Sequence, residues 1–447
     1  MELHNVTILE VLEAREARVR CQQGLLTQFG RPMVSFTMNI AGPVKDSPLI
    51  RRGFGLGCEQ LDRQLQRVRA RVLHRELLYL PTGPEGYWVV DLPAAALKDL
   101  TVELEEGSEL GRLFDLDVLD PNGVKLDRAV ERGCLICGKP GRGCARSRAH
   151  SVAELQAKTE QLLTAALERL DRETAAQLAV RSLLYEVAVT PKPGLVDRDN
   201  SGSHNDMDVY TFLASAPALW PYFHTCVQIG QQTANQPPEK TFAALRWPGK
   251  QAEHAMLRAT DGVNTHKGAI FSLGILCGAL GRLDHALWQH PQAVVDQCAA
   301  MTRGVTAADF AGLTEETAVT AGQKLYLHHG ITGVRGQLEA GLPAVLHHGL
   351  PVLEQGLDLG KTPDEAGAAA LLALIAASED TNLMTRGGLD AQRQAAAEAA
   401  ALLAREPYPN RETLEALDRA YREKNLSPGG SADLLAICWM LHFLRTP

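Results

Sequence analysis

The chain has 447 residues, 45% of them apolar and 22% charged, which is typical of a soluble globular protein of two or three domains. The formal net charge of −8 argues against a basic nucleic-acid-binding surface, and no run of about 18 apolar residues predicts a membrane span. Nine scattered cysteines and an N-terminus, MELHNVTILE, without the pattern of a signal peptide favour a reducing cytoplasm.

The start of the chain predicts a helix, a buried strand and a charged turn. Apolar residues recur at helical spacing over residues 7–26, and residues 32–40 (PMVSFTMNI) have the β-branched and apolar types that favour a strand. The turn AGPVKDSP follows, and then two arginines. This combination suits a phosphate-bearing ligand, and a hairpin turn with surface charges is the alternative. The phosphate-binding candidates are Asn39, Lys45, Arg51 and Arg52.

The next elements are a predicted helix over residues 58–80, a strand over residues 87–91 and a strand that carries two aspartates. Polar and apolar positions alternate over residues 111–120 (GRLFDLDVLD), so that Asp115 and Asp117 share one face. Two carboxylates on a half-buried face are costly unless they share a cation, and their oxygens suit Mg²⁺ that bridges to a substrate phosphate. Metal-dependent nucleotidyl transferases have this arrangement; a solvated edge strand is the alternative.

Four potential zinc ligands come next. Cys134, Cys137, Cys144 and His150 have the spacing C-x2-C-x6-C-x5-H around a glycine-rich knuckle. Three thiolates and an imidazole are a ligand set for tetrahedral Zn²⁺. A second C-x-x-C pair does not follow, so the alternative is a glycine-rich turn with reduced thiols, in which nearby arginines contact phosphate or an acidic partner.

A long helix joins the two parts of the chain. Ser151 followed by Glu154 has the form of a capping box, and the helical pattern continues to Val187. A linker rich in Gly, Pro or Ser does not interrupt it, so we place the domain boundary inside this helix. We expect residues 1–170 to form an α+β domain, a nucleotidyltransferase-like mixed sheet with helices, and residues 171–447 to form a larger all-α domain.

Four polar loops interrupt the Ala- and Leu-rich helices of the second part. Residues 190–208 concentrate Lys, Arg, His and four Asp in a loop marked by Gly and Pro, which is typical of a polyanion or metal site. Residues 260–269, 378–388 and 425–433 repeat the combination of Gly with Asp, Asn or His. The loop 260–269 enters a small-residue helix whose free N–H groups can bind an anion. Together the loops predict one convergent site; solvated connectors or capping loops are the alternative for each.

These loops resemble, in the same order, those of the triphosphoribosyl-dephospho-CoA synthase family: TPKPGLVDRDNSGSHNDMD, DGVNTHKGAI, SEDTNLMTRGG and LSPGGSADLLA. That resemblance runs from about Thr174 to the C-terminus. Residues 8–155 are similar to apo-citrate lyase phosphoribosyl-dephospho-CoA transferase, through VSFTMNIAGPVKDSPLIRRGF, GRLFDLDVLDP and CLICGKPGRGCARSR. The whole chain resembles a bifunctional fusion that builds and attaches the citrate lyase prosthetic group. Ser203, where the synthase pattern has alanine, is a small departure.

The second part also resembles the synthase that serves malonate decarboxylase. Its fusion to a transferase of the citrate lyase type favours citrate lyase.

The resemblance implies that the second part makes 2'-(5''-triphosphoribosyl)-3'-dephospho-CoA from ATP and 3'-dephospho-CoA and releases adenine. Departure of adenine builds oxocarbenium character on the ribose, so the site needs carboxylates, an acid, a base, Mg²⁺ and cations for the triphosphate. For proton transfer we expect His204 or His266. For Mg²⁺ or the ribosyl cation we expect Asp206, Asp208, Glu379 and Asp380. For substrate and phosphate binding we expect Lys192, Arg198, Asn264, Lys267, Asn382, Arg386, Ser427 and Asp433.

For the first part the resemblance implies nucleotidyl transfer. A serine of the citrate lyase acyl carrier protein attacks the α-phosphorus of that product, and pyrophosphate leaves. The reaction needs a metal on both the transferred phosphate and the leaving group. Asp115 and Asp117 are the expected Mg²⁺ ligands, with Asn39, Lys45, Arg51 and Arg52 on phosphates. The expected partners are this carrier protein and small nucleotides, without nucleic acid or membrane.

Two other interpretations stay open. Asp-rich loops on Ala-rich helices also suit a metal-dependent ADP-ribosyl or nucleoside hydrolase, in which adenine release does not depend on dephospho-CoA. The cysteine cluster also suits a zinc-knuckle adaptor that binds the carrier protein without releasing pyrophosphate.

Overall fold

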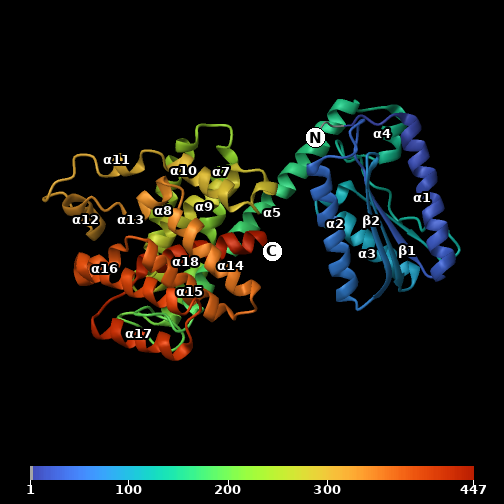
Figure 1. The fold of residues 1–447 in the computed structure, drawn as a ribbon. Coiled ribbons are helices and arrows are strands. Elements are labelled where there is room, and N and C mark those ends of the chain that lie inside the picture. The colour runs from blue at the N-terminus through green and yellow to red at the C-terminus, as the bar shows by residue number, and fades with distance from the viewer. Residues whose placement is uncertain (1–3, 447) are drawn as a thin grey trace. The chain divides into compact units, whose positions relative to one another are not determined.

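The computed structural model describes residues 4–446, and the chain forms two compact units, Met1–Arg169 and Leu170–Pro447 (Figure 1). The division falls inside α5 (Val152–Ala188), a helix of 37 residues. The predicted capping box is present at its start: Glu154 N donates to Ser151 Oγ at 3.2 Å, and Ser151 N donates to the Glu154 carboxylate at 2.8 Å. Each unit has a hydrophobic core of its own.

The first unit has a β-α-β-β-α-β order between an N-terminal helix and the start of α5. Its elements are α1 (Ile8–Phe29), β1 (Met33–Met38), α2 (Pro48–Arg67), β2 (Arg71–Leu80), β3 (Gly83–Asp91), α3 (Ala94–Glu106), η1 (Leu110–Leu113), β4 (Phe114–Leu119) and α4 (Gly141–Ser147). The strands form one antiparallel sheet in the order β2-β3-β1-β4. This is the ferredoxin-like, or split β-α-β, topology.

The α+β class of this unit is confirmed, but the predicted mixed sheet is wrong. The helix α2 connects β1 to β2, and α3 connects β3 to β4, which would give parallel pairs if those strands were neighbours. Instead β3 lies between β1 and β2, and β1 lies between β3 and β4. Every strand therefore meets only antiparallel partners.

The helix predicted over residues 58–80 is wrong in its second half. The helix α2 ends at Arg67, and β2 starts at Arg71 and pairs along its length with β3. Arg69, in the turn between them, has a positive φ of 54°. The run RVLHRELLYL contains good helix formers, but hairpin pairing with β3 overrides this local preference.

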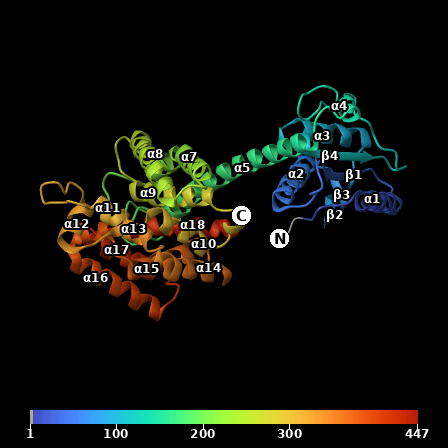
Figure 2. The ribbon, with the colours of Figure 1, turned by 90° about the horizontal axis from the view of Figure 1, so that it is seen from above.

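Helices cover both faces of the sheet (Figures 1 and 2). On one face α2, α3 and the start of α5 pack against apolar side chains such as Phe36. On the other face α1 packs against a smaller cluster that includes Met33 and Leu119. Because side chains alternate along a strand, Asp115 and Asp117 lie on the same face as Leu119. The face under α1 therefore combines an apolar cluster with a polar end.

Within the described residues the second unit consists of helices and loops, as the sequence predicts. Its elements after α5 are α6 (Val209–Ala218), α7 (Trp220–Gln232), α8 (Pro238–Ala259), α9 (Lys267–Arg282), η2 (His285–Leu287), α10 (Pro291–Thr302), α11 (Val305–Asp309), α12 (Ala321–His329), α13 (Gly333–Glu339), η3 (Val345–Gly349), α14 (Leu350–Asp358), α15 (Pro363–Ala377), α16 (Thr381–Arg405), α17 (Arg411–Glu423) and α18 (Gly429–Arg445). The centre of its core is formed by α9, α15 and α18, which are buried over most of their length. Among residues 4–446, none of the helices combines the length and apolar character needed to cross a membrane.

Glycines allow α7 and α9 to touch through their backbones. A Cβ atom on Gly281 of α9 would lie 2.1 Å from the carbonyl oxygen of Val227, and one on Gly230 of α7 would lie 2.1 Å from that of Gly278. Since these oxygens belong to helical backbone, they cannot retreat without bending a helix. The closely packed small-residue helix predicted after the second loop is therefore confirmed.

We predict that Gly281→Ala lowers the free energy of unfolding of the second unit by about 1–3 kcal/mol, because the added methyl group overlaps backbone atoms. Denaturant titration followed by far-UV circular dichroism measures the change. Gly322→Ala in α12 is the control, because a Cβ there meets nothing within 4 Å. Equal unfolding midpoints for the two variants would contradict the close crossing of α7 and α9.

Candidate active sites

The loop that follows α5 is folded around one aspartate. Residues 190–197 are all buried. The Asp197 carboxylate accepts hydrogen bonds from the backbone N–H groups of Lys192 at 2.9 Å, Asp199 at 2.8 Å and Asn200 at 3.0 Å. These bonds close a turn, so the loop is ordered by its own charged residues. A solvated connector is excluded for residues 190–197.

The same loop is held against α17 and against the loop before α18. The Asp418 carboxylate accepts hydrogen bonds from Gly194 N at 2.9 Å and from Asn200 Nδ2 at 3.2 Å. Gly194 has a φ of +69°, and a Cβ atom on it would lie 2.3 Å from the carbonyl oxygen of Leu426. Glycine is needed for this approach. The first and fourth predicted loops therefore touch through their backbones.

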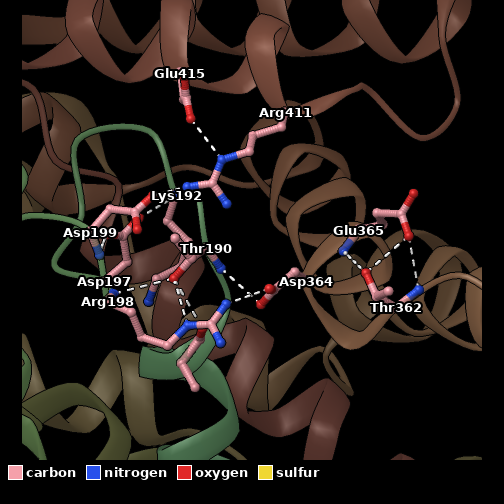
Figure 3. Close-up of polar contacts among 11 residues, drawn as sticks. Thr190, Lys192, Asp197, Arg198, Asp199, Thr362, Asp364, Glu365, Arg411 and Glu415 are labelled. Atoms are coloured by element: carbon pink, nitrogen blue, oxygen red, sulfur yellow. Dashed lines mark hydrogen bonds and ion pairs between the residues drawn. The ribbon is translucent and has the colours of Figure 1, made fainter.

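The outer part of the loop pairs with the N-terminal regions of α15 and α17 (Figure 3). Arg198 Nε donates to Thr190 Oγ1 at 3.2 Å, and its guanidinium forms an ion pair with Asp364 of α15. Asp199 forms an ion pair with Arg411 of α17. Arg198, an expected phosphate contact, therefore fastens the loop to a neighbouring helix.

All four loops line one cavity of about 400 Å³ in the second unit. The expected site residues in its wall are Lys192, His204, Asn264, His266, Lys267, Glu379, Asp380, Asn382, Arg386, Ser427 and Asp433. Arg198 is not among the lining residues. Glu186 of α5 and Gln337 of α13 also line the cavity, and the sequence analysis did not single them out. The loops that share a composition thus also line the same cavity.

Asp206 and Asp208, the other expected Mg²⁺ ligands, are not in the cavity wall. Asp208 is the N-cap of α6: Thr211 N donates to its carboxylate at 3.0 Å, and this hydrogen bond lowers the pKa of Asp208. Asp206 has a side chain that is 65% exposed and lies 3.9 Å from His204 Nδ1. A helix cap and a metal ligand both need a carboxylate in a polar loop, so the sequence alone does not distinguish them.

Arg386 of α16 connects three of the loops. Its Nη1 donates to Ser203 O at 2.7 Å and to Asn425 Oδ1 at 2.9 Å, and its Nη2 lies 3.2 Å from His204 Nδ1. The other ring nitrogen of His204 lies 3.0 Å from Ser427 Oγ. Burial, and then the charge of Arg386, lowers the pKa of His204, so its ring is neutral at pH 7.

Two buried acids in the cavity wall are committed to protein partners. Glu186 pairs with the buried Lys192, whose Nζ also donates to the Glu186 carbonyl oxygen at 2.7 Å. Asp380 caps α16 and accepts a hydrogen bond from Ser431 N of α18 at 2.7 Å. Burial raises the pKa of both Glu186 and Asp380. Asp380 therefore joins the third and fourth loops.

Asp433 of α18 closely approaches the N-terminus of α9. A Cβ atom on Gly268 would lie 1.9 Å from Asp433 Oδ2. Asp433 as a whole residue is partly accessible to solvent, but its carboxyl group is enclosed by protein. This burial, and then the charges of Glu186 and Asp380, raise the pKa of Asp433 well above its usual value. A carboxyl group that retains its proton at higher pH can act as a general acid.

The first unit has a polar cavity of about 180 Å³ beside the end of β1. Asn39, Lys45 and Asp115, three of the expected site residues, line it together with Arg15 and Arg18 of α1. Burial, and then the charge of Arg15, lowers the pKa of Lys45. The cavity therefore brings three basic side chains and an aspartate of β4 together.

Asp115 and Asp117 lie opposite Thr37 and Ser35 of β1. Asp117 forms an ion pair of 2.6 Å with Lys125. Asp115 is accessible to solvent, but the surrounding protein shields its carboxyl group, and this desolvation together with the charge of Asp117 raises its pKa. A cation shared by the two carboxylates would relieve this repulsion, so the pair fits a divalent metal.

Arg51 and Arg52 are not in the wall of this cavity. Residues 41–48 are predicted as a turn that the two arginines follow, whereas Ser47 caps a helix that begins at Pro48 and contains both arginines. The Arg51 guanidinium pairs with Asp46. The serine and proline are the sequence signal for this helix start.

Cys134, Cys137, Cys144 and His150 come together in the first unit. One potential ligand atom from each lies within 4.8 Å of the others. Gly138, with a φ of 72°, donates its N–H to the Cys134 carbonyl oxygen at 3.0 Å and closes the knuckle. A hydrogen bond with His150 lowers the pKa of Cys137 to about 6. Three sulfurs and one nitrogen at this separation fit a tetrahedral metal site.

Two arginines fasten the cysteine segment to β4. Arg112 Nη2 donates to the carbonyl oxygens of Gly133 at 2.9 Å and Cys134 at 3.2 Å. Arg132 Nη1 donates to the carbonyl oxygen of Phe114, the first residue of β4, at 2.6 Å. The order of the cysteine segment is therefore linked to the strand that carries the two aspartates.

Two family models match the chain. One, described as ATP:dephospho-CoA triphosphoribosyl transferase, matches residues 172–447, and the other, described as apo-citrate lyase phosphoribosyl-dephospho-CoA transferase, matches residues 6–166. A relative from Haemophilus influenzae, Protein CitXG, is 36% identical over 97% of this chain and 95% of its own length. The chain belongs to the fused CitX–CitG family.

Other relatives of this CitX–CitG chain agree with that result. Protein CitXG from Leuconostoc mesenteroides subsp. cremoris is 31% identical over 97% of this chain and 96% of its own length. The 2-(5''-triphosphoribosyl)-3'-dephosphocoenzyme-A synthase from Pectobacterium atrosepticum is 43% identical over 60% of this chain and 89% of its own length. The resemblance inferred from the motifs is thus confirmed, and the protein is a bifunctional transferase for assembly of the citrate lyase prosthetic group.

Proposed function

We propose that residues 171–447 transfer the triphosphoribosyl group of ATP to the 2'-hydroxyl of 3'-dephospho-CoA. The hydroxyl oxygen bonds to C1' of the ATP ribose, and the bond between C1' and adenine breaks. The products are 2'-(5''-triphosphoribosyl)-3'-dephospho-CoA and adenine, which gains the proton that the hydroxyl loses. The observation that carries this proposal is the single cavity where four loops bring cations, neutral histidines and carboxyl groups together.

The cavity residues suit different parts of this reaction. We assign phosphate binding to the cationic and amide side chains and to a serine, because charge-assisted hydrogen bonds hold phosphates well. These residues are Asn264, Lys267, Asn382, Arg386 and Ser427. We assign proton donation to the leaving adenine to Asp433, because its pKa is raised. His204, with both ring nitrogens near protein partners, would order Arg386 and Ser427.

Mg²⁺ is expected with the triphosphate, whose charge it would partly neutralise. Glu379 is the exposed carboxylate in the cavity wall and fits as its ligand. Asp380 fits less well, since its carboxylate already accepts hydrogen bonds from the starts of two helices. Asp206 and Asp208 fit less well because they do not line the cavity. We therefore favour Glu379 among the four carboxylates first expected to bind this metal.

We propose that residues 1–170 carry out the second reaction, a nucleotidyl transfer. A serine hydroxyl of the citrate lyase acyl carrier protein attacks the α-phosphorus of the triphosphoribosyl product, a phosphodiester forms, and pyrophosphate leaves. Asp115 and Asp117 would hold Mg²⁺, which supplies charge stabilisation for the phosphorus centre and the leaving group. Lys45 and Arg15 support phosphate binding, since they line the same cavity as Asp115 and Asn39, while Arg18 pairs with the buried Glu85.

We propose that Cys134, Cys137, Cys144 and His150 bind a structural Zn²⁺. The clustered donor atoms support this assignment. A metal there would order the segment that Arg112 and Arg132 fasten to β4. We also propose a cytoplasmic location, because all nine cysteines are free thiols, which a reducing compartment maintains.

Glu379→Gln and Asp115→Asn are predicted to separate the two activities. Loss of the Glu379 charge should lower adenine release about 100-fold and leave transfer of the preformed triphosphoribosyl donor unchanged. Asp115→Asn should lower transfer of the preformed donor and leave adenine release unchanged, because it removes a carboxylate expected to hold the metal. Chromatographic assay of adenine and enzymatic assay of pyrophosphate measure the two steps.

Exposed acids of the same units provide the controls, Glu398→Gln and Asp99→Asn, and both should retain both activities. Loss of both activities in Glu379→Gln or in Asp115→Asn would contradict the assignment of one reaction to each unit. Adenine release by the unsubstituted protein without dephospho-CoA would favour a hydrolase instead.

We predict that the purified protein contains a single zinc ion per chain and that Cys144→Ser loses it. Transfer to the carrier protein should fall about 10–100-fold in this variant, because β4 loses support, while adenine release should not change. Elemental analysis measures the metal, and hydrogen exchange should show faster exchange over residues 114–119. Cys21→Ser, which removes a thiol outside the cluster, is the control. A zinc-free protein with full transfer activity would contradict the assignment.

A further inference from the structure

His266, at the N-terminus of α9, is buried in the wall of the larger cavity with an exposure of 3%. Its ring lies edge-on to Phe212, with 5.0 Å between the ring centroids. Burial, and then the charge of Lys192, lowers the pKa of His266 to about 3, so the ring is neutral at physiological pH. A neutral imidazole has one N–H donor and one acceptor nitrogen, and the surroundings decide which nitrogen has the proton.

Two hydroxyl groups, those of the buried Ser215 and the partly buried Thr265, fix this choice. Thr265 Oγ1 donates to Ser215 Oγ at 2.7 Å, and Ser215 Oγ lies 2.8 Å from His266 Nδ1. Ser215 has no exposed surface, so its own O–H proton needs a protein acceptor. Thr265 Oγ1 is not that acceptor, because it already donates to the serine oxygen. The serine proton therefore goes to Nδ1 of His266. The hydrogen bonds therefore run from Thr265 to Ser215 to Nδ1 of His266.

The opposite tautomer would be costly. If Nδ1 had the proton, it would donate to Ser215 Oγ or to Thr265 Oγ1, which lies 3.2 Å away. In either case the serine O–H would be buried without an acceptor. An unsatisfied buried hydroxyl costs about 1–3 kcal/mol. The ring proton therefore lies on Nε2, and among the described residues Nε2 has no hydrogen-bond partner. A buried N–H without a protein partner, in the wall of a substrate cavity, is a donor available for a ligand.

We propose that His266 donates its Nε2–H to a ring nitrogen of the adenine of ATP, and that Ser215 is the positioning residue that keeps the proton on Nε2. The proposal rests on the synthase reaction proposed above and specifies the role of one of its residues. An uncharged donor beside the Phe212 ring suits a flat heterocycle with acceptor nitrogens better than it suits a phosphate. The cationic side chains Lys267 and Arg386 remain for the phosphates.

The donor would assist departure of the base without itself losing a proton. As the bond between C1' and adenine breaks, the electron pair moves to the purine ring and its nitrogens become more negative. A fixed N–H then stabilises the charge that develops, and the stabilisation is larger in the transition state than in bound ATP. The proton that adenine finally gains comes from the acceptor hydroxyl, through the acid and base of the site. His266 is therefore not the general base.

The tautomer can be measured independently of the reaction. In ¹⁵N-histidine-labelled protein, long-range ¹H–¹⁵N correlation spectra should show His266 with an unprotonated Nδ1 and a protonated Nε2. The signal is identified by its loss in His266→Gln. The double variant Ser215→Ala with Thr265→Val should show a mixture of tautomers, and Thr265→Val alone should not. A proton on Nδ1 in the unsubstituted protein would overturn the proposal.

Kinetics with altered bases test the acceptor. His266→Phe should lower the rate of adenine release about 100-fold, whereas His266→Gln, whose amide nitrogen can replace Nε2–H, should retain most of it. The analogues 1-deaza-ATP, 3-deaza-ATP and 7-deaza-ATP each lack one of the ring nitrogens that can accept a hydrogen bond. For one of them the rate penalty should be smaller in His266→Phe than in the unsubstituted protein, because donor and acceptor act as a pair.

Rate penalties for all three analogues that are as large in His266→Phe as in the unsubstituted protein would overturn the assignment of the acceptor. A protein that releases no adenine from ATP would instead contradict the synthase reaction, and the spectra would still report the tautomer. These two failures are distinguishable.

Discussion

The ion pair between Lys192 and Glu186 is the contact on which the larger site depends. Lys192 is 1% exposed, and its ammonium group contacts both the carboxylate and the carbonyl oxygen of Glu186. Removing one partner would leave an uncompensated buried charge, at a cost of about 3–5 kcal/mol. Glu186 lies in the last turn of α5, so the pair sets the path of the chain as it leaves the helix. The turn around Asp197, and with it the first loop, follows from that path.

The third and fourth loops are tied to other loops before any substrate binds. Arg386 spans the first, third and fourth loops, and Asp380 joins the starts of α16 and α18. A site whose donors and charges are fixed in advance needs little reorganisation during the reaction, which is how electrostatic preorganisation lowers a barrier. In the first unit, hydrogen bonds also order the site in advance, since Arg112 and Arg132 connect the cysteine segment to the region of β4, the strand that carries Asp115 and Asp117. Its ferredoxin-like topology supports many functions, so its chemistry depends on these side chains.

Sequence patterns predicted the parts that rest on local signals. Gly-marked loops, the alternation around Asp115 and the spacing of the zinc ligands are local, and the structure brings the corresponding residues together. Partners distant in the chain could not be predicted: Arg15 joins the smaller cavity only because α1 packs on the sheet, and Ser215 meets His266 only through packing of α6. The strand β2 was missed because pairing with β3 overrides its helical composition. Arg198 and Asp208 were predicted from their charges alone, and in the structure Arg198 pairs with Asp364, Asp208 caps α6, and neither lines the cavity.

The proposed function places two active sites on one chain, and the second site uses the product of the first. The most direct test uses intact mass spectrometry of the acyl carrier protein. Asp115→Asn protein is incubated with ATP, Mg²⁺ and 3'-dephospho-CoA and removed by filtration, and the filtrate is added to Glu379→Gln protein and carrier. We predict that the carrier gains the mass of one phosphoribosyl-dephospho-CoA group, and that neither variant alone produces it from ATP. An unmodified carrier in the filtrate reaction, under conditions where the unsubstituted protein modifies it fully, would contradict the account.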